Sequence, residues 1–164
     1  MHDVLARAAT TDDAPVIARI YNEGIEDGIA TFETRPRTAD DVREWLGRRF
    51  PVVVVENGSG EGIAFASTSE YRPRECYRGV AEFSVYVARS ARRIGAGRLA
   101  MERLIEESRQ AGFWKLVSRV FVENTASRAL LQRLGFREVG IYERHGKLRG
   151  TWRDTVIVER LISD

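Results

Sequence analysis

The sequence has few cysteines and histidines, the residues that form disulfide bonds or bind metals. It has one cysteine, Cys76, and two histidines, His2 and His145, among 164 residues. A single cysteine cannot form an intrachain disulfide, which excludes a fold held by such bridges. These three residues do not supply the ligand sets of the usual zinc sites, so we expect no metal centre.

Long apolar runs and an excess of one charge are also lacking. The longest purely aliphatic run is Val52–Val55, far short of the roughly 18 residues of a membrane span. The first residues, through Arg7, do not show the basic and then apolar pattern of a secretion signal. The 26 basic and 24 acidic residues leave a net charge of +2, which does not favour nucleic-acid binding. We therefore expect a cytoplasmic protein without membrane or nucleic-acid partners.

What is present predicts one globular domain over residues 1–164. Hydrophobic residues make up 43% and charged residues 30% of the chain, as in soluble domains. Hydrophobic spacing and turn residues predict strands at 4–8, 51–56, 62–71, 80–88, 116–122, 136–144 and 151–161, with polar loops at 72–79 and 145–150. They predict helices from Pro15 to Gly28, after Thr38 over Val42, Trp45 and Leu46, from Gly97 to Gly112, and from Asn124 to Leu134. This order predicts an α/β fold, a mixed sheet with helices on both faces.

The segment Arg92-x-x-Gly95-x-Gly97 carries the clearest functional pattern. It links a predicted strand to a predicted helix. Glycines let a ligand approach the backbone, and the first helical N–H groups with nearby arginines favour a phosphate or pyrophosphate. Three interpretations remain open: a coenzyme A loop, a helix start that binds nothing, or the dinucleotide fingerprint Gly95-x-Gly97-x-x-Ala100. The last is weakened because the six residues from Arg89 to Ile94 separate it from the strand.

A second motif gives this loop a context. Asn124-x-x-Ser127, followed by Leu130, Leu134, Gly135 and Phe136, together with the loop resembles motifs B and A of the GNAT superfamily of N-acetyltransferases. The resemblance covers essentially the whole chain. It implies a central mixed, mostly antiparallel sheet and acetyl-CoA as cosubstrate.

Other segments resemble a narrower group, the phosphinothricin, arsinothricin and methionine sulfoximine N-acetyltransferases. They are Ile20–Asn22, Thr31–Thr34, Glu82–Val87 and Gly150–Asp154. This resemblance implies acetyl transfer to the α-amine of a small glutamate-like amino acid, for detoxification or antibiotic resistance, by a homodimer. Two alternatives stay open: transfer to another amine or a peptide, and an inactive coenzyme A sensor.

The resemblance also implies roles for individual residues. Glu82 is the expected general base, and Arg74 the expected partner of the substrate carboxylate, with Tyr77 and Phe32 beside it. Arg72 and Arg78 are alternatives to Arg74. The implied acetyl-CoA contacts are Val85, Tyr86, Val87, Arg92, Arg93, Ile94, Gly95, Ala96, Gly97, Arg98, Asn124 and Ser127.

One position departs from the pattern. Many superfamily members have a tyrosine, and the phosphinothricin enzymes a histidine, where this chain has Leu131. Leucine cannot protonate the leaving thiolate. We expect either that water does so or that no acid is needed, because a thiol with a pKa near 8.5 leaves readily. His145 and Cys76 are expected to lie on the surface without a catalytic role.

Overall fold

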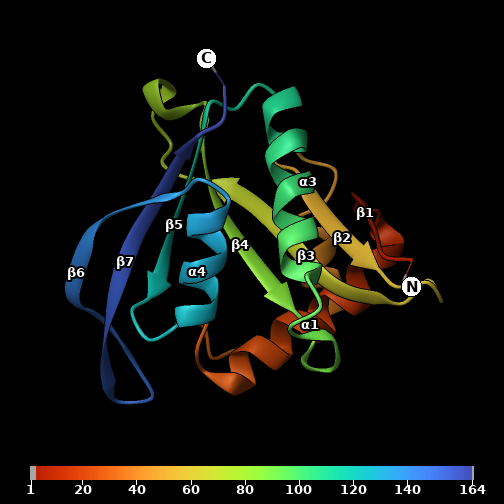
Figure 1. The fold of residues 1–164 in the computed structure, drawn as a ribbon, viewed down its shortest axis with the longest axis horizontal. Helices are drawn as coiled ribbons and strands as arrows, with labels where there is room; N and C mark the ends of the chain where they lie inside the picture. Colours follow the sequence, from red (N-terminus) through yellow and green to blue (C-terminus); the bar gives the residue numbers. More distant parts are fainter. Residues whose placement is uncertain (1–2, 164) are drawn as a thin grey trace.

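The computed structural model describes residues 3–163, which share one seven-stranded mixed sheet in the order β1-β2-β3-β4-β5-β7-β6 (Figure 1). The strands are β1 Leu5–Ala8, β2 Val52–Glu56, β3 Gly62–Glu70, β4 Val80–Val87, β5 Lys115–Phe121, β6 Arg137–Leu148 and β7 Thr151–Leu161. The helices are α1 Ala14–Asp27, α2 Ala39–Arg43, α3 Ala96–Gln110 and α4 Thr125–Arg133. Within these residues β4 and β5 pair in parallel and all other neighbours pair antiparallel. The predicted fold class is confirmed.

Two helix boundaries follow the residues that predicted them. α1 has a proline in its first turn and ends at Gly28, whose φ of 68° is left-handed and suits glycine. α3 begins after Gly95, whose φ is 86°. No helix within residues 3–163 is both long and apolar enough to span a bilayer.

The second helix is shorter than predicted. α2 starts where expected, with the Thr38 side chain accepting a hydrogen bond from the Asp41 N–H, but it stops at Arg43. Trp45 and Leu46 follow in turns and still pack against the core. Their helical spacing therefore reflected a shared buried side, not a continuous helix.

The predicted polar loop at residues 145–150 is wrong over most of its length. β6 continues to Leu148 and pairs with β7 through a bulge between Tyr142 and Gly146, where Arg144 has a φ of 47°. Only Arg149 and Gly150, both with positive φ, form the turn, as in a tight two-residue hairpin. The segment looked like a loop because β6 is an exposed edge strand rich in polar residues.

β4 organises the two faces of the sheet. Side chains alternate along a strand, and the ring of Phe83 lies 4.9 Å from that of Phe136, which follows α4. A Cβ added to Gly97 of α3 would lie 3.3 Å from Val87. On the opposite face, a Cβ on Gly24 of α1 would lie 2.9 Å from the Tyr86 ring. α3 and α4 therefore cover one face of β4, and α1 covers the other.

Candidate active site

The site lies where the two parallel strands separate. β4 and β5 pair only from Val80 to Glu82 and from Lys115 to Val117. In Figure 1 the two strands run together near the top and diverge downward, with α4 in front of the gap. The backbone of β4 beyond Glu82 therefore has no β5 ladder to pair with.

One side-chain hydrogen bond shows which backbone groups this separation frees. The Ser118 hydroxyl on β5 donates to the Phe83 carbonyl over 2.8 Å, so that carbonyl points toward β5. The Ala88 N–H instead donates to Ile63 at the β3 side over 2.8 Å. Because backbone groups alternate sides along a strand, the N–H and C=O groups of Val85 and Val87 face the gap. They can hydrogen bond to a ligand there without any demand on their side chains.

A narrow slot passes through the gap and joins a wider cavity. The slot, about 50 Å³, is lined by residues that include Val85 and Tyr86 of β4 and Asn124, Ser127 and Leu131 at α4. The cavity, about 590 Å³, lies on the α1 face and shares Ser84, Ser118 and Arg119 with the slot, among others. A ligand threaded through the slot from the α3–α4 side would place its tip in the cavity.

At the other end of the gap is the glycine loop. Its predicted residues Arg92, Arg93, Ile94 and Gly95 are exposed, whereas Ala96 and Gly97 are buried at the start of α3. No side chain caps this helix, so its first N–H groups remain available to an anion. A Cβ on Gly97 would also lie 3.4 Å from Leu130 of α4, so the glycine lets α3 approach both β4 and α4.

Carboxylates already pair with most arginines of this loop. Asp27 at the end of α1 accepts from Arg92 over 2.5 Å and from Arg89 over 3.1 Å. These hydrogen bonds, that of Arg92 first, hold the pKa of Asp27 below its usual range. Arg98 pairs with Glu102 over 2.7 Å. Within residues 3–163 Arg93 has no such partner, and its φ of 68° is rarely adopted outside glycine.

α4 contributes to the slot through its first turn. The Asn124 side chain accepts from the Ser127 N–H over 3.2 Å and so caps the helix. Its amide also donates to the Ile29 carbonyl over 3.2 Å, which fixes the segment after α1 against the slot. Leu131 is 1% exposed and lines the slot, so the position expected for an acid carries an apolar side chain.

Glu82 lines the cavity, and its surroundings were not foreseen. The Arg119 guanidinium on β5 donates to Glu82 Oε1 over 3.4 Å and contacts His145 Nε2 over 3.2 Å. Lys147 is also among the residues that line the cavity, but its ammonium lies over the ring of Trp152 at 4.5 Å, and Trp152 does not line the cavity. His145 was predicted to be a surface residue without a role; it is exposed, but it faces this cavity and stacks on Tyr142 at 4.5 Å.

Aromatic residues and one hydroxyl complete the cavity. The rings of Phe32, as predicted for this wall, and Phe121 meet edge to face at 4.8 Å. Burial raises the phenol pKa of both Tyr21 and Tyr86, so these hydroxyls remain protonated at neutral pH. Thr155 on β7 is 1% exposed, and its Oγ1 has no hydrogen-bond partner in the described part of the chain.

The structure does not bring the predicted carboxylate partner into this cavity. Arg74 and Tyr77 belong to the loop before β4 and are not among the residues that line the cavity. The Tyr77 ring packs on Tyr71 at 5.4 Å. Of the two alternatives, Arg72 lies over Tyr71 and Arg78 offers its carbonyl to Arg49. Arg119, by contrast, does line the cavity, and it is the one cation inside the predicted strand at 116–122.

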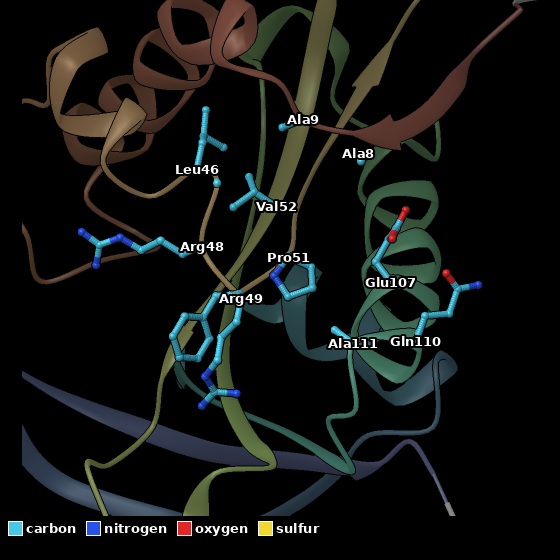
Figure 2. A pocket seen from close by; sticks show the side chains of 12 residues that line it. Ala8, Ala9, Leu46, Arg48, Arg49, Pro51, Val52, Glu107, Gln110 and Ala111 are labelled. Atoms are coloured by element: carbon cyan, nitrogen blue, oxygen red, sulfur yellow. The ribbon is translucent and has the colours of Figure 1, made fainter.

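A second hollow lies at the opposite end of the sheet. Figure 2 shows Glu107 and Gln110 of α3 on one side of it, with Arg48 and Pro51, which precede β2, on the other. Among the described residues that line it, none was predicted for the site. No group of three potential metal ligands occurs within residues 3–163.

Comparison with known proteins agrees with this geometry. The sequence profile of the acetyltransferase (GNAT) family matches residues 17–136. The chain is 32% identical over 157 residues to an L-methionine sulfoximine/L-methionine sulfone acetyltransferase of Pseudomonas aeruginosa, covering 93% of this chain and 91% of the relative.

Two solved structures are close in shape. A GNAT superfamily phosphinothricin acetyltransferase from Sinorhizobium meliloti in complex with acetyl-CoA superposes with a TM-score of 0.90 at 29% identity, covering 98% of this chain and 89% of that one. A ribosomal-protein-alanine N-acetyltransferase from Brucella melitensis gives 0.90 at 35%, covering 96% and 99%.

Proposed function

This chain belongs to the acetyltransferase (GNAT) family, and from that premise we propose that it transfers the acetyl group of acetyl-CoA to the α-amine of a small glutamate-like amino acid. The observation that carries the proposal is the slot between β4 and β5, which opens into the cavity that Glu82 lines. The names of the relatives support the acceptor class.

The residues of this chain fit acetyl-CoA. The uncapped start of α3 suits the pyrophosphate, as does Arg93, which has no carboxylate partner among residues 3–163. The backbone groups of Val85 and Val87 that face the gap suit the pantetheine amides, and Asn124 and Ser127 line its path. When bound there, acetyl-CoA supplies a thioester carbonyl carbon that an amine can attack.

Glu82 is the base that this chain offers. Its carboxylate lines the cavity where the slot opens, and it can accept a proton from the substrate ammonium, directly or through water. The nitrogen lone pair is then free to attack the carbonyl carbon. The Val85 N–H, turned toward the gap, can donate to the carbonyl oxygen as negative charge develops on it.

No acid is assigned on α4. Leu131 fills the place beside the slot and cannot donate a proton. The carbon–sulfur bond breaks with the electron pair on sulfur, and water protonates the thiolate afterward. A thiol pKa near 8.5 makes such a leaving group tolerable at neutral pH.

The charged side chains of the cavity are balanced in pairs. Of those that line it, Glu33 is paired with Arg37 over 3.0 Å, and Glu82 is paired with Arg119 over 3.4 Å. The Lys147 ammonium lies over the Trp152 ring, which does not line the cavity. The α-ammonium and α-carboxylate of an amino acid are a balanced pair of the same kind, which suits this cavity.

We further propose a homodimer and a detoxifying role in the cytoplasm. The last two strands expose Val139, Ile141, Tyr142 and Trp152, each more than two-fifths exposed, and apolar side chains exposed in this way are of the kind that a second copy would cover. Light scattering on a sizing column tests the dimer. Growth on phosphinothricin of cells that express the chain tests the protective role.

An amine panel tests the acceptor. Thiol release from acetyl-CoA, with product mass, is measured for phosphinothricin, arsinothricin, methionine sulfoximine, methionine sulfone, a cationic amine and a peptide with an N-terminal alanine. We expect acetylation of at least one of the four amino acids. Turnover of the peptide alone would favour the second function, which the likeness to the Brucella enzyme supports. Binding of acetyl-CoA with no turnover of any amine would indicate the sensor.

A further inference from the structure

The contact between Glu82 and Arg119 places opposite charges side by side at the mouth of the slot. Their closest atoms, Glu82 Oε1 and an Arg119 Nη, are 3.4 Å apart, at the long end of hydrogen bonding. The two side chains are 33% and 47% exposed, and pairs of this kind contribute little to stability. A ligand can therefore enter between them at small cost.

An α-amino acid carries the matching pair of charges. Its ammonium and carboxylate groups are attached to one carbon atom, so they present a positive and a negative charge next to each other. With the ammonium on Glu82 and the carboxylate on Arg119, the four charges alternate around a square. The nitrogen would then contact the base that must deprotonate it.

The Arg119 guanidinium is oriented by its neighbours and still has unused N–H donors. One of its amino groups contacts His145 Nε2 over 3.2 Å, and the His145 ring is stacked on Tyr142. A guanidinium has five N–H donors, and the contacts to Glu82 and His145 use two of them. The others can bind a carboxylate in two-pronged fashion.

A second observation indicates that a polar ligand enters this cavity. Thr155 is 1% exposed and lines the cavity, yet its Oγ1 has no hydrogen-bond partner within residues 3–163. Thr155 lies opposite Phe121 in the β5–β7 register, two residues along β5 from Arg119. A buried hydroxyl without a partner is costly, so an oxygen of the acceptor side chain would satisfy it.

We propose that Arg119 and Glu82 together bind the zwitterionic end of a free α-amino acid, and that the polar head of the acceptor reaches Thr155. This inference rests on the proposed function and names the residue that recognises the acceptor carboxylate. It assigns to Arg119 the role that the sequence had suggested for Arg74. It also excludes peptide N-termini as good acceptors, because their first residue has no free α-carboxylate.

The test compares two acceptors that differ only at the carboxylate: methionine sulfone and its α-carboxamide. kcat/KM is measured for both with the full chain as wild type, Arg119→Met and Arg119→Lys. Arg48→Met is the matched control, since this exposed arginine lies beside the other hollow. Calorimetric titration with acetyl-CoA checks that each variant retains the cosubstrate site.

We expect the wild type to prefer the acid over the amide by about 10- to 150-fold, the factor of one charged hydrogen bond. Arg119→Met should bring that ratio close to one, because the acid loses its carboxylate partner and the amide has no carboxylate to lose. Arg119→Lys keeps the positive charge but cannot bind a carboxylate through two parallel N–H groups, so it should give an intermediate ratio. Arg48→Met should keep the wild-type ratio.

The outcomes distinguish the role of Arg119 from the proposed function as a whole. A wild-type ratio retained in Arg119→Met, or a ratio abolished by Arg74→Met instead, overturns the inference and leaves the proposed function standing. Acetylation of cationic amines alone, with neither sulfone compound accepted, overturns both. Should Arg119→Met fail to bind acetyl-CoA, the ratio in Arg119→Lys decides the matter.

Discussion

Replacing Glu82 by glutamine removes the proposed base with little change in side-chain size. Glutamine has no negative charge, so it can neither accept the ammonium proton nor form the ion pairs of Glu82. Loss of a general base typically lowers kcat by about 10²–10⁴-fold, or about 2.7–5.5 kcal/mol of barrier. Because one third of the Glu82 side chain is exposed, water and buffer can also accept the ammonium proton in the variant. We therefore expect a loss near the lower end, about 10²-fold.

Stability and cosubstrate binding should change little in this variant. The ion pair with Arg119 is exposed and long, and such pairs contribute about 0–1 kcal/mol. The assay is thiol release as a function of pH, with thermal unfolding and acetyl-CoA affinity as controls. At neutral pH the variant depends on the small neutral fraction of the substrate amine, which grows about tenfold per pH unit below the amine pKa, so the deficit should shrink as pH rises. Near-normal turnover of Glu82→Gln at neutral pH would remove Glu82 from the mechanism.

Three further predictions concern the cosubstrate site and stability. Arg93→Glu should weaken acetyl-CoA binding by about tenfold or more, because it puts a negative charge beside the start of α3. Calorimetric titration measures this affinity, and an unchanged value would refute the assignment of the loop to acetyl-CoA. Gly24→Ala should destabilise by about 1–3 kcal/mol in urea unfolding, since its Cβ would lie 2.9 Å from a buried tyrosine ring, whereas Gly140→Ala, with nothing within 4 Å, should be close to neutral. Arg7 lowers the pKa of Asp13 in the folded protein. Their ion pair therefore stabilises the fold above the unfolded pKa of 3.8, and this stabilisation is lost as the pH falls through the folded pKa. Asp13→Asn should flatten the acid side of a plot of unfolding free energy against pH, and an unaltered acid side would refute this.

Local chemistry explains why much of the fold could be predicted. Pro15 and Gly28 mark the ends of α1, and Gly95 and Gly97 mark the start of α3, through backbone constraints that act on neighbouring residues. The slot also followed from local motifs, since Val85 and Asn124 belong to segments that carry their own signature. By contrast, the extent of β6 depends on pairing with β7, which the polar edge of this strand conceals.

The acceptor cavity could not be predicted in the same way. Arg119 and His145 are 26 residues apart in sequence, and they meet only because β7 pairs with both β5 and β6. Thr155 joins them through the β5–β7 register. A shift of one residue in that register would turn these side chains to the opposite face. Pattern and resemblance contain no such register, so the sequence suggested Arg74 for the carboxylate, and only the structure places Arg119 in the cavity.

The parting of β4 and β5 has a consequence for how this enzyme could change over evolutionary time. Val85 and Val87 offer only main-chain groups to the gap, and nearly any substitution there leaves those groups in place. The cavity proposed for the acceptor, in contrast, is lined by side chains from α1, from the segment after it and from four strands, including Phe32, Arg119 and Thr155. A single codon change can alter each of these side chains and leave the backbone groups of the gap in place. On the proposed function, new acceptors could therefore be acquired one mutation at a time, while the choice of acyl donor is kept.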